Sequence, residues 1–222
     1  MKKLYIYCCG GLGKEVLELA KEVNDINRRW DEISFIDDNK VSDIVNEAKV
    51  YNYYDVINDS TINDIEVIIA TGEPQYRRKI YNRLKKNNIK LATLIHPNCR
   101  ISKYNSIGEG SIISNGTILT TNIEIGKCVI ININSTIGHD VKIKDFTTIS
   151  PTCNISGSVN IGTCTYIGSG VSIRDEVTIG NNSIVGIGSV VTKDIPDNVI
   201  AYGNPAKVIK QNIEQIVFKG KR

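Results

Sequence analysis

The stretch IEIGKCVIININSTIGHDVKI, residues 123–143, carries an isoleucine at every sixth position from Ile125, and this spacing decides the fold. The same period continues in both directions without a slip, so that sixteen consecutive positions are aliphatic. These are Ile101, Ile107, Ile113, Leu119, Ile125, Ile131, Ile137, Ile143, Ile149, Ile155, Ile161, Ile167, Ile173, Ile179, Val185 and Val191. Aliphatic residues make up only about a quarter to a third of an average sequence, so a run of this length excludes chance.

A period of six fits neither the 3.6-residue turn of an α-helix nor the two-residue alternation of a strand. It is typical of a parallel β-helix of hexapeptide repeats, in which three repeats form one coil of about 18 residues. The aliphatic residue and a small residue four positions later, such as Cys153, are expected to point into a triangular prism. The residues between them are expected at turns, where Cys128 and Cys164 would be mildly reactive thiols.

Before the repeats, apolar runs alternate with segments of helical spacing, which predicts a small parallel α/β sheet. The expected strands are residues 4–8, 33–36, 66–70 and 91–95, and the expected helices are residues 14–23 and 74–86. Such sheets bind ligands at the carboxyl ends of their strands. The sequence therefore predicts ligand-binding residues in the loops that follow these strands.

The first of these loops is a glycine turn that contains Gly10, Gly11 and Leu12, and the second strand ends in Asp37 and Asp38. A glycine turn lets a phosphate approach the N-terminus of a helix, and a carboxylate at a strand end binds ribose hydroxyls. Val16 stands where a G-x-G-x-x-G motif needs its third glycine, which argues against NAD. A nucleotide is one interpretation; the other is that the glycines only form a turn and the aspartates are solvated.

Composition narrows the class of function. The net charge is +3 and 23% of the residues are charged, which favours neither a nucleic-acid nor a membrane partner. The apolar run after Met1 is too short for a signal peptide, and no run is long enough to span a membrane. The six cysteines show no C-x-x-C spacing, so we expect reduced thiols in a cytoplasmic protein.

The chain resembles the PglD/NeuD-like sugar acetyltransferases over nearly its whole length. The resemblance rests on the glycine loop, on Phe35-Ile36-Asp37-Asp38, on Leu94-Ile95-His96-Pro97 and on the hexapeptide repeats. It implies an α/β Rossmann-like domain over residues 1–96 that binds the nucleotide sugar, a left-handed parallel β-helix over residues 97–200 and a C-terminal tail over residues 201–222. It also implies a homotrimer with each active site between neighbouring subunits.

The resemblance further implies two substrates, acetyl-CoA and a nucleotide-linked amino sugar. The implied contacts of the sugar nucleotide are Gly10, Gly11, Leu12, Asp37, Asp38 and Gly72. The implied contacts of acetyl-CoA are Thr148, Gly157, Ser169, Gly186, Ile187 and Lys207. Leu12 and Thr148 stand where many relatives have a histidine, so the exact acceptor stays open and the contact with the thioester is expected to be reshaped.

His139 is the predicted general base. It lies two residues after the inward-pointing Ile137, at a turn, so its side chain does not fill the prism. Transfer of an acetyl group to an amine requires a proton acceptor, and an imidazole, which titrates at about pH 6.5, serves at neutral pH. Asp140 is predicted to hold the imidazole tautomer, with a solvated acid as the alternative. Spacing by 18 places Gly157 one coil beyond His139, where its N–H would stabilise the oxyanion.

The prediction is therefore an acetyl-CoA-dependent N-acetyltransferase that acts on a UDP- or dTDP-linked 4-amino-4,6-dideoxy sugar for a surface glycan. Transfer is expected to be direct, in a ternary complex, because no Ser/His/Asp or Cys/His pairing is visible. The alternatives are an O-acetyltransferase for sialic acid or another glycan sugar, and a non-catalytic nucleotide-sugar-binding or scaffold protein. Two histidines, His96 and His139, are too few for the three zinc ligands of a γ-class carbonic anhydrase, so no metal is expected.

Overall fold

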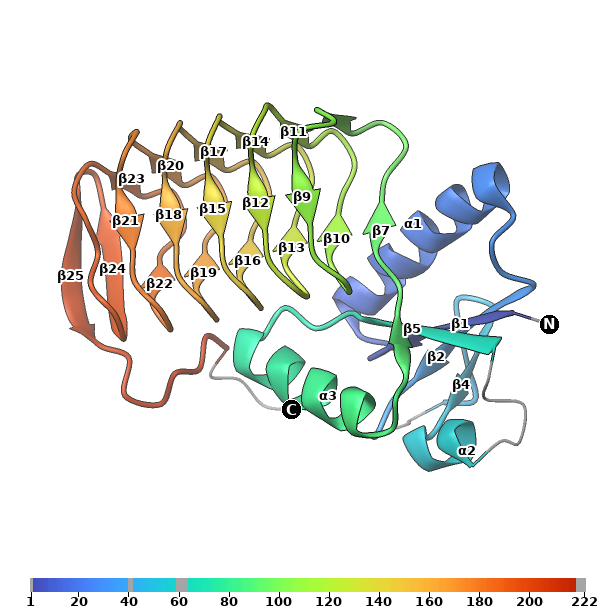
Figure 1. The fold of residues 1–222 in the computed structure, drawn as a ribbon. Coiled ribbons are helices and arrows are strands. Elements are labelled where there is room, and N and C mark those ends of the chain that lie inside the picture. The colour runs from blue at the N-terminus through green and yellow to red at the C-terminus, as the bar shows by residue number, and fades with distance from the viewer. Residues whose placement is uncertain (1, 40–41, 59–63, 219–222) are drawn as a thin grey trace.

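The N-terminal domain is a six-stranded sheet with helices, shown with the rest of the chain in Figure 1. The computed structural model describes residues 2–39, 42–58 and 64–218. The strands are β1 (Lys3–Tyr7), β2 (Glu32–Ile36), β3 (Ile44–Val45), β4 (Ala48–Tyr51), β5 (Ile65–Ile69) and β6 (Lys90–Leu91). The helices are α1 (Gly11–Asn27), α2 (Tyr53–Ile57) and α3 (Pro74–Lys86).

The sheet has the order β3-β4-β2-β1-β5-β6 and is parallel except for the β3–β4 pair. The predicted parallel α/β domain is thus confirmed, while β3, β4 and α2 are missed because they are too short to show a period. The predicted last strand, residues 91–95, is in fact two strands. Its first part is β6, and its second part is β7 (Leu94–Ile95), which pairs with the β-helix.

The repeats form a left-handed parallel β-helix with three flat faces. Face 1 consists of β7, β10 (Ile112–Ile113), β13 (Ile130–Ile131), β16 (Thr148–Ile149), β19 (Tyr166–Ile167) and β22 (Ile184–Val185). Face 2 consists of β8 (Arg100–Ile101), β11 (Ile118–Leu119), β14 (Thr136–Ile137), β17 (Asn154–Ile155), β20 (Ser172–Ile173) and β23 (Val190–Val191). Face 3 consists of β9 (Ser106–Ile107), β12 (Glu124–Ile125), β15 (Lys142–Ile143), β18 (Asn160–Ile161) and β21 (Thr178–Ile179).

The interior of the prism follows the predicted pattern. From Ile113 to Val191 every aliphatic residue of the six-residue period is at most 4% exposed. The small residues are buried too, and their hydroxyls are satisfied by carbonyls of the chain: Thr147 Oγ1 donates to Gly162 O at 2.6 Å and Thr165 Oγ1 to Gly180 O at 2.7 Å. Burying these hydroxyls therefore costs little free energy, because each has a hydrogen-bond partner.

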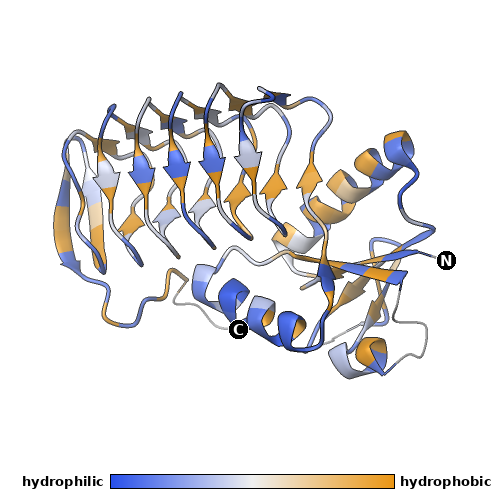
Figure 2. Cartoon of the chain, viewed as in Figure 1, coloured by the Kyte–Doolittle hydropathy of each residue, from blue (hydrophilic) through white to orange (hydrophobic). Residues whose placement is uncertain are grey.

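Face 1 rests on the N-terminal domain. The outward residues of β10 and β13, Ile112 and Ile130, are fully buried in one cluster with Leu4, Ile6 and Val16. In Figure 2 the strands β7 and β10 are orange, whereas much of α3 is blue. The prism thus presents an apolar face to the domain.

Arg77 of α3 binds the edge of the prism between faces 3 and 1. Its side chain is completely buried, and its guanidinium donates to the carbonyls of Cys128 and Phe146 at 2.8 and 2.6 Å and to Thr148 Oγ1 at 2.8 Å. Burial lowers the pKa of Arg77 to about 10, so the group still carries its charge at neutral pH. A rigid guanidinium suits this role because it directs several N–H donors at fixed acceptors.

The expectation that Cys128 and Cys164 are mildly reactive is wrong. Both lie at turns, as predicted, but on the edge that α3 covers, and they are 0% and 4% exposed. Burial raises the pKa of Cys128 to about 12 and also raises that of Cys164. Their thiols therefore stay protonated and inaccessible.

The chain after the prism returns to the N-terminal domain. Strand β24 (Val199–Gly203) adds to face 1 and pairs in antiparallel fashion with β25 (Ala206–Gln211). The following segment contacts α3, where the N–H groups of Val217 and Phe218 donate to Glu73 Oε2 at 3.0 and 3.1 Å. The C-terminal segment thus holds the loop that precedes α3.

Candidate active site

A cavity of about 480 Å³ lies at the carboxyl ends of β1 and β2. Its walls are formed by Cys8, Cys9, Gly10, Lys14, Asp37, Asn39, Val45, Thr71 and Tyr76. A Cβ built on Gly10 or Gly11 would meet nothing within 4 Å, so the turn leaves open space at the N-terminus of α1. Backbone N–H groups at such a terminus attract an anion such as a phosphate.

The two aspartates after β2 have different surroundings. Asp37 lines the cavity, and its Oδ2 accepts from the N–H of Cys9 at 3.0 Å and lies 3.2 Å from its thiol. Burial and the bond to Asp37 raise the pKa of Cys9 to about 11. Asp38 instead pairs with Arg83 at 2.9 Å and accepts from the hydroxyl of Tyr7. The structure therefore places Asp37 at the cavity and Asp38 in an ion pair outside it.

His139 and Asp140 lie together on the prism edge between faces 2 and 3. The Nδ1 of His139 is 2.8 Å from Asp140 Oδ2, and the two side chains are 64% and 53% exposed. Asp140 adopts the left-handed conformation, with φ of 59°, that recurs at the turns of the prism. If Nδ1 carries the proton and donates it to Asp140, Nε2 is left with a free lone pair.

Gly157 lies directly against the imidazole, one coil along the prism. A Cβ built on Gly157 would be 2.6 Å from His139 Nε2, so any side chain there would collide with the ring. The backbone confirms the spacing, because Ser158 N donates to His139 O at 2.8 Å. The structure thus brings His139, Asp140 and Gly157 into one exposed cluster.

A second row of predicted residues lies on the edge between faces 1 and 2. Pro151, Ser169 and Ile187 occupy successive coils there, with Gly170 N bonded to Pro151 O and Gly188 N to Ser169 O, at 3.0 and 2.9 Å. Ile187 is 78% exposed, which is unusual for a large aliphatic side chain. Gly186 packs on Tyr202, where a Cβ would come within 2.8 Å. This row offers an extended and partly apolar surface.

Two further predicted contacts of acetyl-CoA lie apart from this row. Thr148 is 2% exposed, accepts from Arg77 and donates to Gly72 O at 3.1 Å, so it belongs to the interface between the prism and α3. Lys207 is exposed on β25, at the end of the prism. Gly72 itself faces the ring of Phe218 rather than the cavity.

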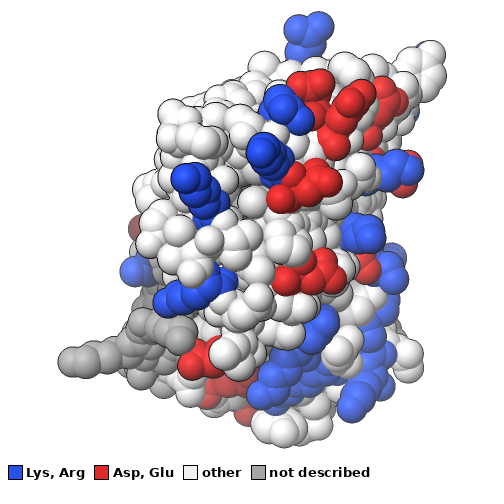
Figure 3. Space-filling model, turned by 90° about the vertical axis from the view of Figure 1, so that its left-hand side faces the viewer, with Lys and Arg blue, Asp and Glu red and all other residues white. Residues whose placement is uncertain are grey.

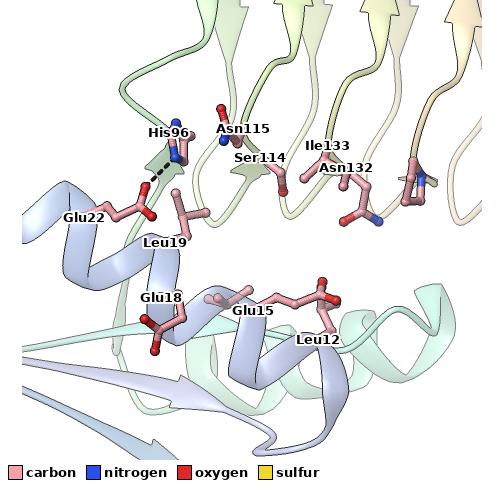
Figure 4. Close-up of a pocket in the computed structure, with 12 residues that line it drawn as sticks. Leu12, Glu15, Glu18, Leu19, Glu22, His96, Ser114, Asn115, Asn132 and Ile133 are labelled. Carbon is pink, nitrogen blue, oxygen red and sulfur yellow. Dashed lines mark ion pairs between the residues drawn. The ribbon is translucent and has the colours of Figure 1, made fainter. Parts of the chain in front are cut away.

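A groove of about 310 Å³ separates α1 from the edge between faces 1 and 2 (Figure 4). Leu12 lies at one end, and the pair formed by His96 and Glu22 lies at the other. The remaining lining residues are Glu15, Val16, Glu18, Leu19, Ser114, Asn115, Asn132, Ile133 and Pro151. Leu12 is the predicted acceptor contact that reaches this groove.

Helix α3 carries six Lys or Arg residues and no Asp or Glu. Figure 3 views the end of the prism that carries β25, and its basic side chains gather at the lower right, on the side where α3 runs. Arg83 and Lys85 are neutralised by Asp38 and Glu109, at 2.9 and 3.1 Å. The helix adds positive potential beside the cavity, which favours an anionic ligand.

Sequence reasoning missed several residues that surround these sites. Lys14 and Asn39 line the cavity next to predicted residues, so their position in the sequence was the available signal. Glu15 reaches the groove only because α1 packs beside the prism. Among the described residues, no group of three or more His, Cys, Asp and Glu side chains is arranged to hold a metal ion. No described helix is both long and apolar enough to cross a bilayer.

The fold defines the architecture: an α/β domain joined to a hexapeptide-repeat β-helix. The family model of the PglD N-terminal domain matches residues 3–84. WeeI from Acinetobacter baumannii AYE is 33% identical, with a TM-score of 0.89 over 94% of this chain and all of that one. The chain therefore belongs to the PglD/NeuD-like family of hexapeptide-repeat sugar acetyltransferases.

Two further relatives have names that describe their ligands. The acetyltransferase domain of PglB from Neisseria gonorrhoeae FA1090, solved in complex with acetyl coenzyme A, is 32% identical, with a TM-score of 0.87 over 94% of this chain and 99% of that one. The GDP-perosamine N-acetyltransferase of Escherichia coli O157:H7 is 30% identical over 83 residues. That alignment spans 37% of this chain and 38% of the relative.

Proposed function

We propose that this chain transfers the acetyl group of acetyl-CoA to the amine of a nucleotide-linked 4-amino sugar, such as a UDP- or dTDP-linked 4-amino-4,6-dideoxy sugar. The observation that carries the proposal is the cluster of His139, Asp140 and Gly157, which leaves an exposed imidazole nitrogen on the prism. Family membership supports the reaction class. The complex of the PglB domain supports acetyl-CoA as the donor, and the name of the perosamine relative supports an amino sugar as the acceptor.

In the proposed reaction His139 Nε2 removes a proton from the sugar amine, which then attacks the thioester. Asp140 accepts from Nδ1–H and so keeps the lone pair on Nε2. The N–H of Gly157 stabilises the oxyanion of the tetrahedral adduct. No residue is acylated, because nothing in the cluster offers a nucleophile other than the imidazole that serves as the base.

The sugar nucleotide is proposed to bind in the cavity at Cys9, Gly10 and Asp37, with its diphosphate at the N-terminus of α1. The sugar then extends past Leu12 into the groove beside α1. The donor is proposed to lie along Ser169, Gly186 and Ile187, with Lys207 near its phosphates. Thr148 has no place in this proposal, since it is buried.

The position of His139 requires a second chain in this proposal. Face 1 rests on the N-terminal domain, and the edge between faces 2 and 3 is the one edge that does not border face 1. The turn between β14 and β15, which carries His139, therefore lies on the side of the prism away from the N-terminal domain (Figure 1). We infer a homotrimer in which His139 of one subunit completes the site at the neighbour's groove.

The test measures release of the CoA thiol with UDP-, dTDP- and GDP-linked 4-amino sugars and with free sialic acid. The expected result is turnover of one amino sugar that His139→Ala abolishes. Turnover of sialic acid alone supports an O-acetyltransferase. If no acceptor is used, binding of the nucleotide sugars without turnover supports the non-catalytic alternative.

A complementation experiment tests the shared site. Each variant is expected to be inactive by itself. His139→Ala lacks the general base, and Asp37→Ala lacks a carboxylate of the sugar-nucleotide cavity. Co-expressed in equal amounts, they are expected to regain about a quarter of the wild-type activity, since a quarter of the sites then combine an intact cavity with an intact histidine. Absence of any recovery in verified mixed trimers contradicts the shared site.

A further inference from the structure

The groove beside α1 contains a carboxylate that the proposed mechanism has not used. Three glutamates of α1 line it: Glu15, Glu18 and Glu22. Glu22 pairs with His96, whose Nδ1 accepts from Asn98 N–H and whose Nε2 therefore donates the proton to Glu22. Glu18 pairs with Lys21 at 3.0 Å. In the described part of the chain, Glu15 is the groove glutamate with neither an ion pair nor a hydrogen bond.

Glu15 lies at the end of the groove where the acceptor is proposed to enter. It follows Leu12 by three residues, so the two side chains are neighbours on one face of α1. Leu12 in turn adjoins the glycine turn of the sugar-nucleotide cavity. Figure 4 shows Glu15 between α1 and the prism, beside Leu12 and facing the edge that carries Asn132.

The opposite wall connects this end of the groove to the proposed path of the donor. Ile133 and Pro151 line the groove, and Ser169 and Ile187 continue the same row at intervals of 18 residues. Neighbouring coils are about 4.8 Å apart, so the row runs straight from the donor surface into the groove. A sugar beside Leu12 and a thioester descending this row would therefore meet near Glu15.

We propose that Glu15 recognises the amino group of the acceptor and makes the site selective for an amine over a hydroxyl. This inference rests on the proposed function and adds to it a residue of this chain. A sugar amine arrives as an ammonium ion, and the other two glutamates of the groove, Glu18 and Glu22, already pair with Lys21 and His96. A carboxylate without a partner is the complement of that charge, and hydrogen bonds between charged groups are about twice as strong as neutral ones.

The nitrogen is cationic at two stages of the reaction. The ammonium first gives one proton to Nε2 of the neighbour's His139, which passes it to solvent. The nitrogen lone pair then forms the C–N bond, and the nitrogen of the tetrahedral adduct is again positive. The C–S bond breaks, the second proton goes from nitrogen to the departing sulfur, and the products are the acetamide and the CoA thiol. Glu15 stabilises both cationic stages, whereas a hydroxyl acceptor is neutral when it binds.

The experiment compares wild type with Glu15→Gln, which keeps the shape and removes the charge. The acceptor is the 4-amino sugar nucleotide that the wild type uses fastest in the panel above. Its analogue with a hydroxyl in place of the amine serves as a competitive ligand. Glu15→Gln is expected to lower kcat/KM for the amine by about 10- to 100-fold and to leave the inhibition constant of the hydroxyl analogue within about 2-fold. Glu15→Asp is expected to retain part of the activity.

The matched control is Asp25→Asn, which removes one negative charge from an exposed position of α1 that does not line the groove. It is expected to behave as wild type. The inference is overturned if Glu15→Gln matches this control, or if it weakens the amine and the hydroxyl analogue equally. Failure of wild type to use any amino sugar defeats the proposed function instead, so the two failures are distinguishable.

Discussion

Two edges of the prism differ in what surrounds them. The edge between faces 3 and 1 is closed within the chain, because Arg77 is fully buried and satisfies carbonyls of two coils. The edge between faces 2 and 3 is open, and its side chains at His139 and Asp140 are more than half exposed. The repeat is the same along both edges, so the difference comes from what packs on them. The closed edge contributes to stability, and in the proposed homotrimer the open edge faces another subunit.

The largest expected effect tests the open edge. His139→Ala is expected to reduce kcat by about 10²- to 10⁴-fold, the usual contribution of a general base. The free energy of unfolding should change by less than about 0.5 kcal/mol, because the side chain is exposed. Steady-state kinetics and urea unfolding check the two values. Lys144→Ala, an exposed residue on another edge, is the control, and equal losses in both variants would break the comparison.

The second prediction tests the closed edge. Arg77→Met removes the donors to three carbonyls and leaves them buried without partners. An orphaned group costs about 1–3 kcal/mol, so a loss of about 3 kcal/mol or more in the free energy of unfolding is expected. Urea unfolding measures it. Arg78→Met, which is exposed on the same helix, should stay within about 0.5 kcal/mol, and a similar loss there would contradict the role of Arg77.

The third prediction compares a glycine-to-alanine substitution on the open edge with one on the closed edge. Gly157→Ala places a methyl against the His139 imidazole, which is exposed and free to rotate away. Activity should fall by about 10²-fold, as expected for a displaced catalytic group, with little loss of stability. Gly162→Ala, on the closed edge, would meet the backbone nitrogen of Asn181 at 2.5 Å. It should instead cost about 1–3 kcal/mol and leave the activity of the folded protein intact. The reverse pattern would refute the comparison.

The smallest expected effect concerns a closed polar cluster away from both edges. Glu66 is 3% exposed and is bonded to Arg29 and Trp30. Burial alone would raise its pKa, but these partners outweigh burial and hold the pKa below the ordinary 4.5. A lowered pKa in the folded state adds stability above pH 4.5 that disappears as the pH falls through the folded value.

Glu66→Gln is therefore expected to cost about 2 kcal/mol at pH 7 and progressively less in acid. Unfolding of both proteins between pH 7 and pH 3 measures this difference. A difference that stays constant over the whole range would show that the charge of Glu66 does not matter.

The β-helix could be predicted from the sequence because every coil repeats the same pattern of residues. The residues of the six-residue period, such as Ile137 and Ile155, are each defined by the local chain, and every coil supplies the same signal again. The same register predicts Gly157 one coil beyond His139, and the two residues are in contact there. The α/β domain was reached less completely, since β3 and α2 have two and five residues and show no period.

The wrong expectation for Cys128 and the unpredicted surroundings of Thr148, Asp38 and Glu15 share one cause. Cys128, Thr148 and Asp38 have local sequence contexts that predict exposed or ligand-binding side chains, yet α3 covers the first two and Arg83 pairs with the third. Glu15 was not singled out, because a glutamate on an amphipathic helix is ordinarily a solvated residue. In each case the deciding partner is far away in the sequence.

The sequence by itself determined the prism, its register, the small α/β sheet and the outward position of His139. These follow from periodicity and from turn residues, which act over one or two coils of chain. The tertiary structure decided which edge of the prism is closed, which of Asp37 and Asp38 lines the cavity, and that Glu15 faces a groove. Docking a sheet and two helices onto one face of the prism depends on contacts between distant segments, and no local pattern of residues encodes them.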